Sequence, residues 1–184
     1  MKKTRCSIVS ILTALPLLLL NSCFIQGVTS DYGKLDENQK AKIIQLKSFN
    51  NLKPGIIYLI NASQLKDEIR KYPKTIVYIF TNGCSSSHCK PLNVYENYAK
   101  KHDYKLFLVM TGFADLDQTT DQDIITPLLA VDNKYYKSRL RNNYVRFFTN
   151  DLLDKPLKSK DSEYQGSLYF FRNGKFERIL EDLP

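Results

Sequence analysis

The chain has 184 residues, of which 43% are hydrophobic and 25% charged, enough for one globular domain after removal of a leader. The formal net charge is +8, but Lys2, Lys3 and Arg5 lie at the extreme N-terminus, and the remaining basic residues are interleaved with acidic ones. The absence of a long basic run and of any nucleic-acid motif argues against nucleic-acid binding. The remaining positive charge is compatible with a weak attraction to anionic lipid headgroups.

Residues 1–22 have the organisation of a secretory leader. A basic start precedes an apolar run at 8–20, which is shorter than the roughly 20 apolar residues that span a bilayer. The run ends in Leu20-Asn21-Ser22-Cys23, which resembles the lipobox of bacterial lipoproteins. The resemblance implies cleavage before Cys23 and a diacylglycerol on its sulfur; the alternative is an ordinary signal peptide and a spare thiol. Since Phe24 is not an acidic retention signal, we expect attachment to the outer membrane, facing the periplasm.

Two segments precede the expected domain at 54–184. Residues 23–34 are expected to form a lipidated tether, because they combine Gly, Ser and Thr with little hydrophobic periodicity. Residues 35–53 are expected to form an N-terminal helix, with Asp36 as a possible cap and apolar residues recurring among polar ones.

Within the domain, strand patterns alternate with helix patterns. Strands are expected at 56–60, 75–80, 104–110 and 127–131, and helices from Asn61 or Ser63 to Pro73, at 92–102 and at 134–153. The run at 75–80 is apolar at nearly every position, which is typical of a central strand covered on both faces. Asn173-Gly174 between two apolar runs predicts a final β-hairpin. The acidic stretch at 111–126 is interpreted as a solvated loop or short helix.

The cysteines single out one pair. The lipobox resemblance implies that Cys6 is removed with the leader and that Cys23 carries the lipid, which would leave Cys84 and Cys89 in an oxidising compartment. The pair lies where a buried strand gives way to a helix, and helix-start N–H groups lower the pKa of a nearby thiol. Cα atoms five residues apart in a helix are roughly 8–9 Å apart, whereas a disulfide needs about 4.4–6.8 Å. If the two cysteines bond, residues 85–87 must therefore loop out.

The order strand, helix, strand, dithiol, helix, strand, helix, hairpin resembles the thioredoxin fold, as do the stretches 74–89 and 168–175. The resemblance implies an α/β three-layer sandwich. Its central mixed sheet would have four to five strands flanked by helices, with an enlarged helical insertion before the final hairpin.

Two departures from thioredoxins affect the site. Gly83 stands where thioredoxins have Trp before the first cysteine, and four residues rather than two separate the pair. The family's cis-proline has two candidate positions for substrate-peptide binding: Gly166 and Ser167 by motif, or Pro127 by spacing from the dithiol.

The resemblance implies thiol–disulfide exchange with envelope protein thiols or disulfides, in a monomer without a cofactor. Cys84 would be the nucleophile, Cys89 the resolving thiol, and His88 would stabilise a thiolate when protonated. One alternative is a non-enzymatic binding or accessory module with a structural disulfide. Another is a copper-binding metallochaperone, but His102 is about 20 Å along the helix from Cys89 and no full zinc ligand set is present, so we expect no metal.

Overall fold

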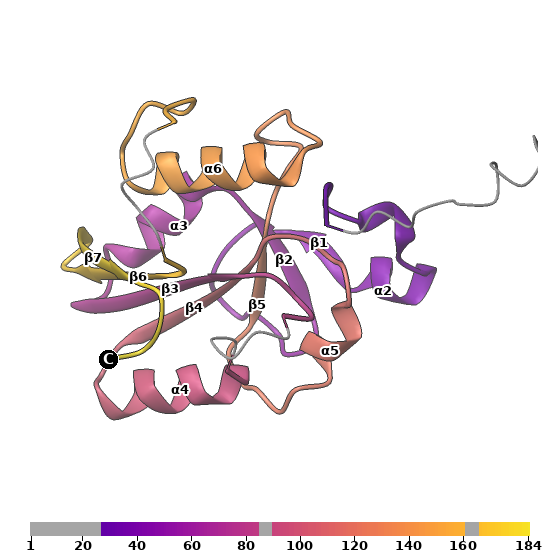
Figure 1. Cartoon of the computed structure of the whole chain (residues 1–184). Coiled ribbons are helices and arrows are strands. Elements are labelled where there is room, and N and C mark those ends of the chain that lie inside the picture. Colours follow the sequence, from indigo (N-terminus) through magenta and orange to yellow (C-terminus); the bar gives the residue numbers. More distant parts are fainter. Residues whose placement is uncertain (1–26, 85–89, 161–165) are drawn as a thin grey trace, which may run out of the picture.

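The computed structural model describes residues 27–84, 90–160 and 166–184. These ranges form a mixed sheet with helices on both faces (Figure 1). The strands are β1 Ile43–Gln45, β2 Ile57–Ile60, β3 Lys74–Phe80, β4 Lys105–Met110, β5 Leu128–Val131, β6 Leu168–Arg172 and β7 Lys175–Leu180. The helices are the 3-10 helix η2 Tyr32–Lys34 and the α-helices α2 Glu37–Ala41, α3 Ala62–Ile69, α4 Leu92–Lys101, α5 Leu116–Thr120 and α6 Arg141–Leu152.

The sheet has seven strands in the order β1-β2-β5-β4-β3-β6-β7. The first five run parallel to one another, and β6 and β7 continue the sheet antiparallel. The prediction of an α/β fold with a mixed sheet is confirmed, but four to five strands was too few. The strand expected at 127–131 is present as β5, between β2 and β4, and β1 comes from a segment expected to be helical.

The central strand β3 is buried on both faces, which explains its continuous apolar sequence. Ile76, Tyr78 and Phe80 face the layer that contains α4 and α5. Val77 and Ile79 face the opposite layer, which contains α3 and α6. Figure 1 shows these two helix pairs on opposite sides of the sheet. The strands that flank α4 are parallel, and β3 pairs with β4 from Thr75–Lys105 to Phe80–Met110.

Two predictions from local sequence, a cap at Asn61 and a turn at Asn173-Gly174, are confirmed. Asn61 caps α3, because its Oδ1 accepts from the Gln64 N–H at 3.0 Å while Gln64 Oε1 accepts from the Asn61 N–H at 3.0 Å. Asn173 and Gly174 both have positive φ, 50° and 76°, which is what a tight β6–β7 turn requires.

The prediction of a single helix over 35–53 is wrong after Ala41. Asp36 does cap a helix, but α2 ends at Ala41 and the chain enters β1, which pairs parallel with β2. Ile43 is 8% exposed and packs in the α4 layer, whereas Leu46 is 4% exposed and packs in the α3 layer. Opposite faces for nearby residues are a property of extended chain, so burial against the sheet overrode the helical pattern.

The insertion before the hairpin contains a shorter helix than the one expected at 134–153. The Asp132 carboxylate accepts from the backbone N–H groups of Lys134 at 3.0 Å and Tyr135 at 3.3 Å, and Lys137 has a φ of 51°. Both features favour turns over helix, so α6 begins only at Arg141.

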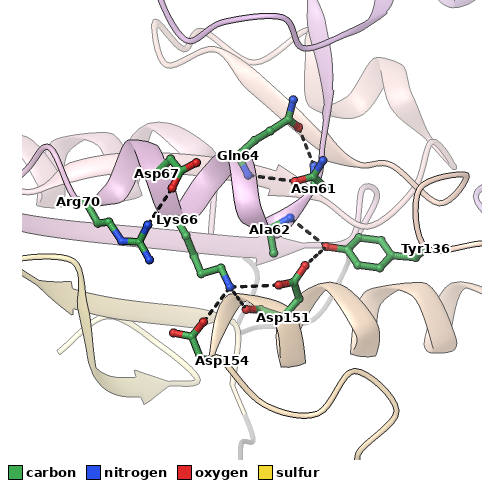
Figure 2. A network of polar contacts seen from close by, with 9 residues as sticks. All are labelled: Asn61, Ala62, Gln64, Lys66, Asp67, Arg70, Tyr136, Asp151 and Asp154. Atoms are coloured by element: carbon green, nitrogen blue, oxygen red, sulfur yellow. Dashed lines mark hydrogen bonds and ion pairs between the residues drawn. The ribbon is translucent and has the colours of Figure 1, made fainter.

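A polar network fastens α6 to α3 (Figure 2). Lys66 Nζ donates to the Asp151 carbonyl at 2.7 Å and to the carboxylates of Asp151 at 3.1 Å and Asp154 at 2.9 Å. The Tyr136 hydroxyl accepts from the Ala62 N–H at 2.9 Å and donates to Asp151 at 3.1 Å. Burial lowers the pKa of Lys66, but the hydrogen bonds to Asp154 and Asp151 outweigh it, so this pKa is raised. Lys66 therefore stays charged and holds the end of α6 against α3.

Candidate functional site

Cys84 lies at the carboxyl end of the central strand. The chain leaves the sheet after Phe80, and the Cys84 side chain is exposed four residues later. His88 and Cys89 lie outside the described residues. The chain is described again from Lys90, and α4 begins at Leu92. The predicted nucleophile thus occupies the edge at which parallel α/β sheets commonly bind ligands.

The buried Asn82 fastens this loop to the segment that follows β4. Only 5% of Asn82 is exposed. Its Nδ2 donates to the Gly112 carbonyl at 2.9 Å, and its Oδ1 accepts from the Thr119 hydroxyl at 2.9 Å. The hydroxyls of Thr81 and Thr111 hydrogen-bond each other at 3.0 Å. The strand end, α5 and the cysteine loop therefore form one hydrogen-bonded unit.

Gly83 is required by both its conformation and its surroundings. Its φ is +65°, and a Cβ at this position would lie 2.6 Å from Asp115 Oδ2 and 2.8 Å from Asp115 Cβ. The Asp115 carboxylate thus packs against the backbone one residue before Cys84. This glycine, which departs from the thioredoxin pattern, has a structural reason in the close approach of Asp115.

Gly83→Ala is expected to destabilise the protein by about 2 kcal/mol, because left-handed backbone costs an L-residue roughly 1–2 kcal/mol and the new methyl meets Asp115. In the background of Asp115→Gly, which removes the contact, Gly83→Ala is expected to cost only the backbone strain, about 1 kcal/mol. Urea unfolding of both variants and of Asp115→Gly alone checks this. Equal stability of Gly83→Ala and the unmodified protein would contradict it.

The start of α4 is held by a side chain from the loop after α5. The Leu92 N–H donates to Gln122 Oε1 at 2.7 Å, which satisfies one of the free N–H groups of the first turn. Further along α4, Glu96 Oε1 accepts from the N–H groups of Ile125 at 3.1 Å and Thr126 at 2.6 Å. The positive end of the α4 dipole is therefore fixed beside the cysteine loop.

A pocket of about 280 Å³ opens next to Cys84. Its lining comes from the end of β3, the cysteine loop, the start of α4 and the segment around α5: Tyr78, Phe80, Thr81, Asn82, Gly83, Cys84, Lys90, Pro91, Leu92, Gln118, Thr119 and Gln122. Tyr78 stacks on Tyr95 with ring centroids 4.0 Å apart. Burial, and then the hydrogen bond with Tyr95, raise the pKa of Tyr78, so its phenol stays neutral. The pocket thus offers an aromatic wall and amide groups beside the exposed cysteine.

The two candidate positions for peptide binding lie in different places. Ser167 O accepts from the Ile79 N–H at 2.9 Å, so Gly166 and Ser167 lie beside the carboxyl end of β3, the same sheet edge as Cys84. Pro127 precedes Leu128, which pairs with Leu108 near the middle of the sheet, two strands away from β3. The described peptide bonds, including Thr126–Pro127, are all trans. Of the two candidate positions, Gly166 and Ser167 lie at the same sheet edge as Cys84, and Pro127 does not.

The described residues contain no group of three His, Cys, Asp or Glu side chains that could hold a metal ion. His102 caps the end of α4 remote from the cysteine loop and lies against Tyr98, with ring centroids 4.3 Å apart. The acidic stretch after β4, expected to be solvated, is exposed at Asp115 and Asp117 but contributes Asp115 to the loop contact.

The comparisons with known proteins add no assignment, since no family model, no curated protein and no solved structure matches the chain. Among the helices of the described ranges, none has the length and apolar character needed to cross a bilayer. The assignment of a function therefore rests on the site itself.

Proposed function

We propose that the chain is a lipid-anchored protein of the bacterial cell envelope with a thioredoxin-like fold, which exchanges thiols and disulfides through Cys84 and Cys89. The observation that carries the proposal is the position of Cys84: exposed, at the carboxyl end of the buried central strand, beside a pocket and ahead of α4. Membrane attachment through Cys23 and location at the outer membrane belong to the same proposal.

The arrangement of strands supports the thioredoxin-like part of the proposal. β3, α4 and β4 form a parallel unit, and the β6–β7 hairpin lies antiparallel on the other side of β3. This is the element order that the resemblance implies around a dithiol. β1 and β5 are additions to it, and they lie on the far side of β4 from the cysteine strand.

The proposed reaction needs only the two thiols and a substrate disulfide. The Cys84 thiolate attacks one substrate sulfur, forming a mixed disulfide and releasing the other sulfur as a thiolate that takes up a proton. The Cys89 thiolate then attacks Cys84 Sγ, which forms the Cys84–Cys89 disulfide and releases the second substrate thiol. The dithiol supplies both electrons, and the reverse sequence oxidises a substrate dithiol. His88 is proposed to stabilise the thiolate form when protonated.

A structural disulfide in a non-enzymatic binding module is the second candidate, and the charges beside Cys84 favour it. The Asp115 carboxylate adjoins the preceding residue, and a negative charge nearby disfavours a thiolate. The Lys90 ammonium, which would favour one, is held by Asp182 at 2.6 Å. A copper-binding role is the weakest candidate.

The reduction potential of the Cys84–Cys89 couple distinguishes these functions. The lipoprotein is equilibrated with glutathione buffers and the free thiols are counted by alkylation, with Cys84→Ser as the control that cannot form the bond. A catalytic pair is expected above about −270 mV, within the range of thioredoxins and oxidants. A potential below about −300 mV, as for structural disulfides, would overturn the redox function.

A further inference from the structure

The described chain begins close to the expected lipid. Cys23 is four residues before Gly27, so their Cα atoms are at most about 14 Å apart. From Gly27 onward the chain is packed on the domain: Val28 O accepts from the Arg141 N–H at 2.8 Å, and Ser30 O accepts from the Phe113 N–H at 2.8 Å. The described part of the segment expected to be a tether is therefore bound to the start of α6 at Val28 and to the residues after β4 at Ser30. A lipid on Cys23 would hold this side of the domain near the bilayer.

The same side carries an exposed basic segment, residues 134–141, which joins the turn after β5 to the start of α6. Its sequence, Lys-Tyr-Tyr-Lys-Ser-Arg-Leu-Arg, contains four basic residues and no acidic one. Lys134, Lys137 and Arg139 are exposed, and in the described part of the chain none of the three forms an ion pair. Tyr135 and Leu140 are each 51% exposed, so an aromatic and an aliphatic side chain lie on the surface beside the basic residues.

The acidic groups next to the basic segment are buried and already bonded. Asp132 is 8% exposed and accepts from the Lys134 and Tyr135 N–H groups and from Gln45. Asp31 is 4% exposed and pairs with Lys34 at 2.8 Å. The charge that the segment 134–141 itself presents to solvent is therefore positive.

We propose that the basic segment docks on anionic phospholipid headgroups of the membrane that carries the lipid anchor, an inference that rests on the lipidation of Cys23. Basic side chains are attracted to an anionic leaflet within a Debye length, about 10 Å at 0.1 M salt. Tyrosine and leucine side chains enter the headgroup region, where an aromatic ring or an apolar chain is favourable. Positive charge, exposed apolar side chains and a short anchor thus coincide on one side.

Docking on this side would orient the cysteine loop. A Cβ on Gly112 would lie 3.6 Å from Arg141 Cδ and 3.2 Å from Ser30 O, and the Gly112 carbonyl accepts from Asn82. The membrane-proximal chain and the cysteine loop are thus linked through one buried glycine. A substrate would then reach Cys84 at the membrane surface.

Acetylation of lysines tests the docking on the full-length mature lipoprotein. The protein is reconstituted in phosphatidylcholine vesicles with or without phosphatidylglycerol, and acetylation is measured by mass spectrometry. Phosphatidylglycerol is expected to slow the reaction of Lys134 and Lys137 about fivefold, and high salt to restore it. Lys100 and Lys101, exposed at the far end of α4, serve as internal references and should not change.

Two charge-reversal variants complete the test. Arg139→Glu is expected to abolish the slowing at Lys134 and Lys137, whereas Lys175→Glu, an equal charge change on the exposed hairpin, should leave it intact. Equal reaction rates in both vesicles, or equal slowing at the reference lysines, would overturn the docking. Flotation of the protein with phosphatidylcholine vesicles depends on the lipid anchor alone. A protein that does not float with these vesicles would overturn the lipidation of Cys23. Neither acetylation nor flotation depends on the reduction potential of the cysteine pair. The docking and the redox function are therefore tested independently of each other.

Discussion

Replacing Asn82 by alanine is expected to lower the free energy of unfolding by about 3 kcal/mol. The side chain satisfies two groups in a buried position, the Gly112 carbonyl and the Thr119 hydroxyl. A buried polar group left without its partner costs about 1–3 kcal/mol, and the variant leaves two such groups. The Thr119 hydroxyl can rotate towards another acceptor, which keeps the total below the upper limit.

Urea unfolding measures this effect, and Asn142→Ala is the matched control because Asn142 is exposed on α6. We expect the control to change stability by less than about 0.5 kcal/mol. The same loss in both variants would show that the Asn82 hydrogen bonds do not support the fold. Because Asn82 lies two residues before Cys84, its loss is also expected to change the reduction potential of the cysteine pair.

The centre of the fold could be predicted because its signals are local. The apolar run of β3 needs cover on both faces, and the helix and strand that follow have short connections. The capping of α3 by Asn61 and the Asn173–Gly174 turn depend on neighbouring residues only. Such features follow from the backbone and side-chain chemistry of a few consecutive positions.

The elements that were missed depend on distant parts of the chain. Ile43 and Ile44 fit a helix by spacing, but pairing with Ile57 and Tyr58 of β2 makes them a strand. The late start of α6 depends on Asp132, whose carboxylate binds two N–H groups that a helix would have used differently. Both the strand β1 and the start of α6 depend on contacts formed in the folded protein, which the local sequence pattern does not show.

The same distinction applies to the site. The position of Cys84 between a buried strand and a helix was visible in the sequence. The residues that hold the loop were not, since Asn82, Gly112 and Thr119 are 30 to 37 residues apart in their hydrogen-bonded pairs. Gly83 was visible only as a departure from a family pattern, and its cause, Asp115, lay in a stretch interpreted as solvated.

Raising the pH above 10 is expected to unfold the protein steeply, because three core tyrosines resist ionisation. The largest pKa shifts are those of Tyr78, Tyr136 and Tyr144, which are 5%, 5% and 0% exposed. Burial raises the pKa of all three, with the Tyr95 hydrogen bond adding to it at Tyr78. In the unfolded chain a tyrosine loses its proton near pH 10, whereas in the folded protein these three keep theirs.

The sign of the pH dependence follows from this proton count. Below pH 10 both states are protonated and the stabilisation is complete; above it the unfolded state binds fewer protons, so the free energy of unfolding falls as the pH rises. Each of these three tyrosines contributes about 1.4 kcal/mol per pH unit, so together they contribute about 4, and the buried Tyr169, whose pKa burial also raises, adds to the slope. A domain of ordinary stability, about 5–15 kcal/mol, would then unfold within roughly one to four pH units above 10.

Urea unfolding at a series of pH values checks this, with a graded set of variants as its own control. Tyr78→Phe is expected to reduce the slope above pH 10 by about 1.4 kcal/mol per unit, and Tyr78→Phe/Tyr136→Phe by about twice as much. A slope unchanged by both variants would contradict the assignment to buried phenols. Tyr78 also lines the pocket beside Cys84. Because the protein is expected to unfold above pH 10, a thiol pKa measured at Cys84 describes the folded site only below that pH.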